Sequence, residues 1–161
     1  MATRIGILTV SDSRSAGQEE DLSGPAMQAA LAELGYQEFE VDLVPDEVPA
    51  IQKAILELCE TCAAVFTTGG TGFTPRDVTP EATAPLLEKR ADSLMELVRL
   101  RGLEFTKLSH ISRGVAGVRG SVLIVNLPGS PKAVRQGIEA LAPLLPELLS
   151  ALAGERCSHG V

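Results

Sequence analysis

The stretch that decides the fold runs from Ala63 to Gly72 and reads AAVFTTGGTG. Its apolar first half predicts a buried strand over Ala63–Thr67, and its second half is a run of threonines and glycines. Glycines allow positive φ and a close approach of the backbone to a ligand, so several N–H groups can converge on an anion. Threonine hydroxyls add further donors. The stretch therefore predicts a phosphate-binding loop at the end of a strand.

Beyond this loop the sequence predicts a helix. Thr79 is interpreted as its N-cap and Pro80 as its first residue, so the loop would lie at the positive end of the helix dipole. The loop matches neither the G-x-x-x-x-G-K-[ST] nor the G-x-G-x-x-G fingerprint, and glycine-rich turns are common at strand ends. Taken alone, this unit leaves a purely structural loop as an equal alternative.

Further apolar runs place the loop in an alternating pattern of strands and helices. Strands are predicted over Arg4–Val10, Phe39–Val44 and Ser121–Asn126, and helices from an N-cap at Ser23 to a stop at Gly35, over Pro49–Leu58, Thr79–Lys89 and Asp92–Arg101 with a stop at Gly102, and after Lys132 with a break near Pro143 and Pro146. The stretch Leu103–Arg119 stays unassigned. Near-continuous apolar strands that alternate with helices predict an α/β fold of three layers, a mostly parallel sheet with helices on both faces.

One edge of such a sheet gathers the polar loops. In an open parallel sheet, ligands bind beyond the carboxyl ends of the strands, where Ser11–Asp12, Thr67–Gly72 and Asn126–Lys132 would meet. Asp46 joins them, because it follows the strand that ends near Val44. Its alternative interpretation is an acid at a helix start, which the helix dipole favours.

The residue types at this edge suit a polyphosphate accompanied by Mg²⁺. The carboxylates of Asp46 and Asp77 would hold the hard cation, while loop amides and Lys132 hold phosphate oxygens. Such sites position an attacking oxygen and neutralise developing charge, so no protein nucleophile is required. Arg76 would support that charge, although neighbouring Arg and Asp residues in loops are also typical of a solvated pair. His110 is interpreted as structural.

Composition narrows the class of protein. With 161 residues we expect one domain, over 1–152, and a flexible tail over 153–161. A net charge of −7 and an aromatic content of 3% argue against nucleic acid as a partner. No leader pattern precedes the first strand, and no apolar run approaches the roughly 18 residues of a membrane span, so we expect a cytoplasmic protein.

The cysteines Cys59, Cys62 and Cys157 suit a reducing compartment better than a disulfide framework. The C-x-x-C pair lies at the end of a predicted helix, whereas a redox pair needs the helix start, where the dipole lowers the thiol pKa. Together with His159 the three cysteines would supply a Cys₃His zinc set. The C-x-H spacing is unlike that of known zinc sites, so we regard this set as a minor alternative.

Six ordered motifs carry a resemblance to a known family. They are ILTVSDS over 7–13, DLSGP over 21–25, VPDE over 44–47, TTGGTG over 67–72, PRDVTPEA over 75–82 and NLPGSPK over 126–132. Together they resemble the MoaB/Mog family of molybdenum-cofactor biosynthesis proteins, from Arg4 to about Leu152. One departure concerns Arg14: the family often has arginine directly after Ser-Asp, where this chain has Ser13.

The resemblance implies the fold of that family and molybdopterin adenylyltransferase activity. In this reaction the terminal phosphate of molybdopterin attacks the α-phosphate of ATP, with Mg²⁺ required, and pyrophosphate is released. By position, Asp46 and Asp77 match the catalytic, Mg²⁺-associated acids of the family. The residues expected to bind the substrates are Ser11, Asp12, Thr68, Gly69, Gly70, Thr71, Gly72, Asn126, Gly129, Ser130 and Lys132. The family further suggests a homotrimer and a molybdenum insertase as partner.

Two other functions compete with catalysis. The protein would be a carrier if it only bound molybdopterin and passed it on, and a scaffold if its loop were structural. The presence of both Asp46 and Asp77 favours catalysis, because two carboxylates at the edge would oppose the binding of a polyphosphate alone.

Overall fold

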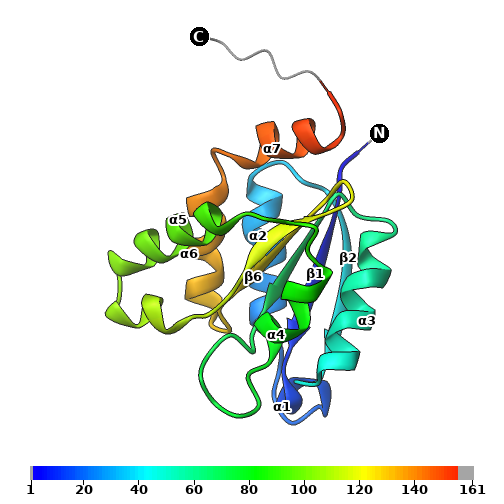
Figure 1. Ribbon diagram of the computed structural model, residues 1–161. Coiled ribbons are helices and arrows are strands. Elements are labelled where there is room, and N and C mark those ends of the chain that lie inside the picture. Colours follow the sequence, from blue (N-terminus) through cyan, green and yellow to red (C-terminus); the bar gives the residue numbers. More distant parts are fainter. Residues whose placement is uncertain (1, 156–161) are drawn as a thin grey trace.

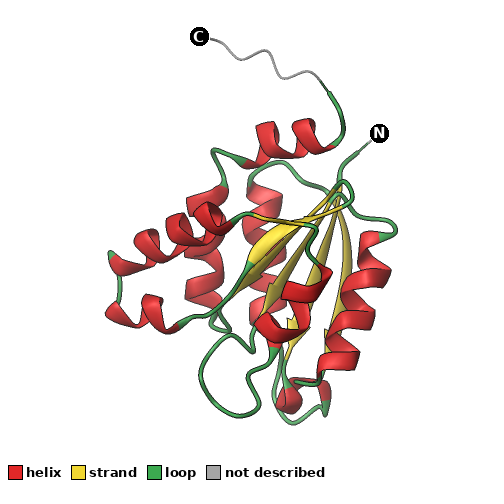
Figure 2. Cartoon of the chain, in the orientation of Figure 1, coloured by secondary structure: helices red, strands yellow, loops and turns green. Residues whose placement is uncertain are grey.

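The computed structural model describes residues 2–155 of the chain, drawn in Figures 1 and 2. The elements are, in order, β1 (Arg4–Val10), α1 (Asp12–Ser15), α2 (Ser23–Glu33), β2 (Glu38–Val44), α3 (Val48–Cys59), β3 (Ala64–Thr68), α4 (Thr79–Thr83), the 3₁₀ helix η1 (Ala84–Leu86), β4 (Lys89–Arg90), α5 (Asp92–Leu103), the 3₁₀ helix η2 (Lys107–Ile111), β5 (Ala116–Arg119), β6 (Val122–Leu127), α6 (Pro131–Leu141) and α7 (Leu145–Leu152).

The strands form one sheet in the order β2-β1-β3-β6-β5-β4. The first four are mutually parallel, and β5 and β4 pair antiparallel at one side. Strands β3 and β6 are buried along their whole length, as expected for parallel strands covered on both faces. The register sets Thr9 beside Thr68 and Thr68 beside Leu127, so the carboxyl ends of three strands are level.

Helices cover both faces of the sheet, which confirms the predicted three-layer α/β class (Figure 2). On one face Ile7 and Phe66 pack in the same core cluster as residues of α2, α5 and α6. On the other face Leu8 and Val65 pack in a second cluster with residues of α3. The near-continuous apolar runs of β1 and β3 therefore supply both cores, because successive side chains of a strand point to opposite faces.

The prediction of one helix over Thr79–Lys89 is wrong. Helix α4 ends at Thr83, a 3₁₀ turn follows, and Lys89 and Arg90 pair with β5 as the short strand β4. Pro85 explains the early end, because a proline lacks the N–H that a continuing α-helix needs. Thr79 is also not the N-cap, which is Val78.

Two further predicted helix signals are wrong. Ser23 does not cap α2: the Asp21 carboxylate accepts hydrogen bonds from the backbone N–H groups of Ser23 and Gly24, both at 3.1 Å. Gly102 does not stop α5, which continues to Leu103. A Cβ at position 102 would lie 2.2 Å from the Ser109 Oγ atom, so this glycine makes room for η2. The stop at Gly35 agrees with the structure, since α2 ends at Glu33 and Gly35 has φ +101°.

The unassigned stretch forms η2 and β5, and the last helical region divides at residues 142–144 into α6 and α7, as the prolines predicted. The division into a 1–152 domain and a 153–161 tail stays a prediction, since residues 156–161 lie outside the described residues. Within residues 2–155, no helix has both the length and the apolar character needed to cross a membrane.

Candidate functional site

The polar loops meet at the carboxyl ends of the parallel strands. The Ser11 N–H donates to the Val44 carbonyl at 2.9 Å, which joins the ends of β1 and β2. The Gly69 N–H donates to the Leu127 carbonyl at 3.2 Å, and the Thr68 hydroxyl donates to the Pro128 carbonyl at 2.7 Å. The loop after β3 (residues 69–78, the glycine loop) and the loop after β6 (residues 128–130, the Pro128 loop) are therefore joined by hydrogen bonds at their starts. Both lie at the edge where the sequence predicted them.

Two glycines fix the path of the glycine loop. Gly69 has φ +97°, and a Cβ there would lie 2.2 Å from the Val10 carbonyl oxygen. Gly70 has φ +68°, and a Cβ there would lie 2.2 Å from the Thr79 Oγ1 atom and 3.0 Å from the Asp46 Oδ1 atom. Only glycine fits these positions without rearrangement, and the missing side chains bring the loop backbone next to Asp46.

Asp46 lies half-buried between β2 and α3 and is bonded reciprocally to Asp12. The Asp46 N–H donates to the Asp12 Oδ1 atom, and the Asp12 N–H donates to the Asp46 Oδ2 atom, both at 2.9 Å. Burial raises the pKa of the Asp46 carboxyl above its ordinary value, and the negative charges of Asp12 and Asp77 raise it further. The Asp12 N–H and the Arg76 guanidinium act in the opposite direction. The charge of Asp77 thus acts on the Asp46 carboxyl, so the two acids belong to one site.

Asp77 is positioned within its own loop. Its Oδ2 atom accepts hydrogen bonds from the Thr74 N–H at 2.9 Å and the Thr74 hydroxyl at 2.8 Å. A Cβ at Gly72 would lie 2.8 Å from this oxygen, so the carboxylate faces the glycine loop. The glycines of the loop therefore approach both acids, Asp46 at position 70 and Asp77 at position 72.

Asp12 and Arg76 form an ion pair across the edge. The Arg76 Nε atom donates to Asp12 Oδ2 at 2.8 Å, and the Arg76 NH2 group donates to Asp12 Oδ1 at 2.9 Å. The hydrogen bond from Arg76 and that from the Asp46 N–H lower the pKa of the Asp12 carboxyl. Arg76 thus pairs with the distant Asp12 and not with its neighbour Asp77, and its support of developing charge stays a prediction.

Arg113 also stabilises the glycine loop, and the sequence did not predict this role. Its guanidinium donates to the Gly72 carbonyl at 2.8 Å and the Asp77 carbonyl at 3.1 Å, and it pairs with the Glu81 carboxylate. It also stacks on the Phe73 ring at 5.3 Å from the centroid. Arg113 thus holds both ends of the segment 72–77. No periodicity marked it, because it lies in the stretch that stayed unassigned.

Several predicted site residues have structural contacts in this protein. Asn126 is fully buried, and its amide donates to the hydroxyls of Thr67 at 3.0 Å and Thr83 at 3.1 Å. The Thr71 hydroxyl is hydrogen-bonded to that of Ser112 at 3.1 Å. Ser130 caps α6 by accepting from the Ala133 N–H at 3.1 Å. The Asn126 side chain therefore supports the loops from inside the fold, whereas Thr71, Ser112 and Ser130 also line the cavity beside the glycine loop.

The remaining predicted residues lie around the same edge. Ser11 caps α1, accepting from the Arg14 N–H at 3.2 Å. A Cβ at Gly129 would lie 3.4 Å from the Gly69 Cα atom, so the two loops are in contact there. Lys132 is exposed in the first turn of α6. Lys132 therefore follows the loop after β6 closely and is accessible to solvent.

A cavity of about 390 Å³ adjoins the glycine loop. It lies between that loop, α5, η2 and the start of α6, and its lining includes Gly72, Leu108, Ile111 and Pro128. Polar atoms enter from residues such as Ser112 and Gln136. The cavity is mostly apolar and opens beside the glycine loop, which is the position expected for the less polar part of a ligand if that loop binds phosphate.

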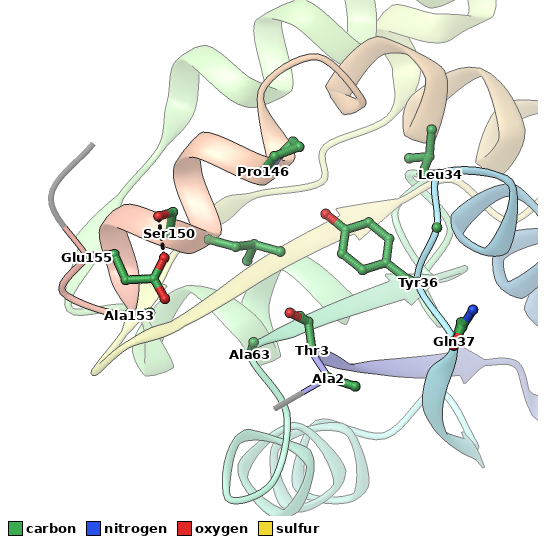
Figure 3. A pocket seen from close by; sticks show the side chains of 12 residues that line it. Ala2, Thr3, Leu34, Tyr36, Gln37, Ala63, Pro146, Ser150, Ala153 and Glu155 are labelled. Carbon is green, nitrogen blue, oxygen red and sulfur yellow. Dashed lines mark hydrogen bonds between the residues drawn. The ribbon is translucent and has the colours of Figure 1, made fainter. Parts of the chain in front are cut away.

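A larger cavity, of about 490 Å³, lies at the opposite end of the sheet (Figure 3). Thr3, Tyr36, Pro146 and Ser150 are among its lining residues, and Figure 3 shows the Tyr36 ring facing into it. None of the predicted site residues lines this cavity. Size therefore does not identify the functional site here, and we assign it to the edge where the acids and glycines meet.

The donor set at the edge fits Mg²⁺ better than a metal held by protein alone. In the described residues no three His, Cys, Asp or Glu side chains gather in a way that could hold a metal ion. Two carboxylates, Asp46 and Asp77, face the loop, and Mg²⁺ is commonly bound by one or two carboxylates together with substrate phosphates and water.

The cysteines give no redox or zinc site within residues 2–155. Cys59 ends α3, and burial raises the pKa of its thiol to about 11. Burial also raises the pKa of the Cys62 thiol. Both thiols are therefore protonated near neutral pH, which opposes nucleophilic or redox chemistry. Cys157 and His159 lie outside the described residues.

The fold and the edge together define a class: α/β proteins whose glycine loop and acids form a site beyond the carboxyl ends of parallel strands, where such proteins bind nucleotides and cofactors. A family model described as the probable molybdopterin binding domain matches residues 6–147. This chain belongs to that family, the MoaB/Mog family of molybdenum-cofactor biosynthesis proteins, as its motifs predicted.

Individual relatives agree with this membership. The molybdopterin adenylyltransferase of Helicobacter pylori strain J99 is 42% identical over 154 residues, which cover 93% of this chain and 88% of the relative. The enzyme of the same name from Escherichia coli K12 is 37% identical over 86% of this chain and 73% of its own. The crystal structure of the molybdopterin biosynthesis enzyme MoaB from Thermus thermophilus has a TM-score of 0.88 and 47% identity, covering 95% of this chain and 98% of that one.

Proposed function

We propose that this chain is a molybdopterin adenylyltransferase of molybdenum-cofactor biosynthesis. It transfers the adenylyl group of ATP to the terminal phosphate of molybdopterin and releases pyrophosphate. The observation that carries the proposal is the approach of one glycine loop to two acids, Asp46 at Gly70 and Asp77 at Gly72. The relatives named for this activity support the same assignment.

The reaction needs positioning and charge compensation more than covalent help from the protein. An oxygen of the molybdopterin phosphate forms a bond to the α-phosphorus of ATP, and the bond from that phosphorus to the bridging oxygen breaks, so pyrophosphate leaves with its electron pair. Backbone N–H groups of residues 69–72 would bind the phosphate oxygens. The glycine conformations keep this backbone close to the acids before substrate arrives, so little reorganisation is required.

Asp46 and Asp77 would hold Mg²⁺ together with phosphate oxygens. Bound there, the ion would offset the negative charge that develops on the reacting phosphates. The raised pKa of Asp46 falls when a cation is bound beside it, since the cation stabilises the ionised carboxylate. Thr74 keeps the Asp77 carboxylate turned toward the loop.

The two substrates have separate places at the edge. The pterin would lie in the cavity of about 390 Å³ between the glycine loop and η2, whose lining is apolar with polar atoms from Ser112 and Gln136. Its terminal phosphate would then reach Gly72, at the rim of the cavity. The nucleotide would lie on the other side of the loop, toward Asp46, with Lys132 and Ser11 at the rim.

The family-based expectations of a cytoplasmic homotrimer and of a molybdenum insertase as partner remain part of this proposal. Self-association, which a homotrimer requires, is supported by apolar side chains that stay exposed on α5, η2 and the turn between them. These include Leu100, Phe105 and Leu108, which are 59%, 56% and 67% exposed. Contacts between copies would cover such a patch. Sedimentation equilibrium of the purified chain measures the mass directly, and a monomer at all concentrations would contradict the trimer.

The activity is tested by incubating purified protein with molybdopterin, ATP and Mg²⁺ and detecting adenylyl-molybdopterin by mass spectrometry. We expect product with the unmodified chain and none without protein. Asp77→Asn should lose about 100-fold or more in turnover, a change of about 2.7 kcal/mol in activation free energy, because one charge opposite the cation is removed. Molybdopterin binding by Asp77→Asn should persist.

The control variant for this assay is Lys53→Gln, at an exposed residue of α3 whose ion pair with Glu57 lies on the helix surface. It should retain full turnover. Tight molybdopterin binding without product in the unmodified chain would favour the carrier function instead. Unchanged turnover in Asp77→Asn would remove that residue from the mechanism.

A further inference from the structure

The Arg76–Asp12 ion pair lies at the edge where we propose that the nucleotide and its metal bind. Arg76 belongs to the glycine loop and Asp12 begins α1, so the pair joins positions 64 residues apart in the sequence. Both side chains are accessible, at 60% for Arg76 and 43% for Asp12. An exposed pair of this kind contributes about 0–1 kcal/mol, so it can be exchanged at little cost.

The Asp12 carboxylate already accepts three hydrogen bonds in this arrangement. Its two carboxylate oxygens accept both hydrogen bonds from Arg76, and Oδ1 also accepts from the Asp46 N–H. Asp12 is in turn tied to Asp46 through its own N–H. The Arg76 guanidinium is therefore the positive charge nearest to the acid pair Asp12 and Asp46 in these contacts, and it stands where a bound cation would compete with it.

The rest of the loop is held independently of Arg76. Arg113 bonds the carbonyls of Gly72 and Asp77, and the Asp77 carboxylate is bonded to Thr74. The intervening tip, from Phe73 to Arg76, is exposed. The Arg76 side chain can therefore leave Asp12 without moving the carboxylate of its neighbour Asp77.

We propose that Arg76 is a nucleotide-binding residue that Asp12 holds in the empty site: on binding, the guanidinium passes from the Asp12 carboxylate to the polyphosphate. The inference rests on the proposed function and names the residue that receives the nucleotide charge. A guanidinium forms two parallel hydrogen bonds to phosphate as readily as to carboxylate, and a polyphosphate carries more charge than one carboxylate. Asp12 thus keeps Arg76 at the edge and is not itself a substrate contact.

The test measures binding of α,β-methylene-ATP with Mg²⁺, without molybdopterin, by calorimetry. Arg76→Gln should weaken the affinity about tenfold, or about 1.4 kcal/mol. Asp12→Asn keeps the shape and the acceptor for the Asp46 N–H but releases Arg76, so it should strengthen affinity about two- to fivefold, within the range of an exposed pair. In the double variant this gain should vanish, because Asp12 acts through Arg76.

A second measurement needs no nucleotide. Trypsin cleaves after an arginine whose side chain is free, so cleavage of the full chain between Arg76 and Asp77 should be several times faster in Asp12→Asn. The control is Asp92→Asn, which breaks the exposed Arg90–Asp92 pair at 2.9 Å and should change neither readout.

Three results would overturn the inference. The first is weaker nucleotide binding in Asp12→Asn. The second is an equal gain in affinity from that change with and without Arg76, which would show a simple charge effect. The third is an equal rate of tryptic cleavage after Arg76 in Asp12→Asn and in the unmodified chain. If the unmodified chain bound no α,β-methylene-ATP, the proposed function itself would fail. Faster cleavage of Asp12→Asn would still support the pairing in that case, so the two failures are distinguishable.

Discussion

Two strand–loop–helix units of this chain, which begin with β3 and β6, have similar strands but different loops and helices. Both β3 and β6 are fully buried parallel strands followed by a loop with glycine and then a helix. After β6 three residues lead directly into α6, which has 11 residues and a serine N-cap. After β3 ten residues, 69–78, precede α4, which has only 5 residues. The similar patterns thus lead to a short, capped turn in one unit and a long loop in the other.

The difference lies in where the polar groups are directed. In the β6 unit they bond to the protein: Asn126 to Thr67 and Thr83, the Gly129 carbonyl to the Ser23 hydroxyl at 2.5 Å, and Ser130 to its own helix. In the β3 unit the glycines turn the backbone toward acids from two loops. The side chains of the β6 unit that bond in this way support the fold, while Pro128 and Gln136 of the same unit line the cavity proposed for the pterin. The loop of the β3 unit is the part that we propose binds the phosphates.

The largest expected effect is on the free energy of unfolding, and it should differ between the loop after β3 and the loop after β6. Gly69→Ala forces a side chain into positive φ and within 2.2 Å of the Val10 carbonyl oxygen. Backbone strain and steric overlap together should lower the free energy of unfolding by about 4 kcal/mol. Gly129→Ala meets only the Gly69 backbone, with the Cα atom at 3.4 Å, and should cost less than about 1 kcal/mol.

Urea denaturation of both alanine variants and the unmodified chain measures this contrast. Equal losses would show that the loops are equally constrained, which would break the comparison. If Gly69→Ala does not fold well enough for the assay, the surface variant Lys53→Gln and Gly129→Ala still establish the baseline, and soluble yield then reports the Gly69 effect.

A second prediction separates activity from stability at Asp46, which faces the β3 loop. Asp46→Asn should lose about 100-fold in turnover, or about 2.7 kcal/mol, for the same reason as Asp77→Asn. It should nevertheless gain thermal stability at pH 7. The folded-state pKa of Asp46 is raised, chiefly by burial, so the ionised carboxylate destabilises the folded state once the pH rises from the ordinary Asp value through the raised one.

The expected change in thermal stability has the opposite sign at Asp12, so Asp12→Asn is the control for Asp46→Asn. Arg76 and the Asp46 N–H lower the pKa of Asp12, so ionised Asp12 stabilises the fold, and that stabilisation is lost as the pH falls through the lowered pKa. Asp12→Asn should therefore melt below the unmodified chain at pH 7, with the difference shrinking in acid. Melting curves at pH 4 and pH 7 test both; shifts of the same sign at pH 7 would contradict the charge assignments.

Most of the layer arrangement could be predicted from the sequence because it depends on long apolar runs. β1 and β3 are near-continuous, and parallel strands in a covered sheet need that pattern. The failures are local. Thr79 was interpreted as a cap, but its hydroxyl donates to the Gly69 carbonyl at 2.9 Å, a contact set by the loop and not by helix propensity. Propensity cannot foresee a partner ten residues away in a turn that glycine permits.

The candidate site shows the same limit. The edge shared by Asp46 and the glycine loop followed from strand polarity, since carboxyl ends of parallel strands meet. Arg113 could not be foreseen, because its partners Gly72, Asp77 and Glu81 become neighbours only when the chain folds. Asn126 was expected at the edge from strand polarity and as a substrate-binding residue from the family motif. Its complete burial follows from the pairing of β6 with β3, which no motif encodes.

The smallest expected effect tests whether Ser130 in the β6 loop only supports the fold. Ser130 accepts from the Ala133 N–H as the N-cap of α6, so Ser130→Ala should lower the free energy of unfolding by about 1 kcal/mol. A capping role leaves KM for both substrates unchanged, whereas a substrate contact would raise it. Ser130→Asp restores a capping acceptor but adds a negative charge near the phosphates. If Ser130→Asp recovers stability and raises KM, Ser130 supports the fold and also borders the substrates. The β3 and β6 units then differ only in how much their residues contribute to substrate binding.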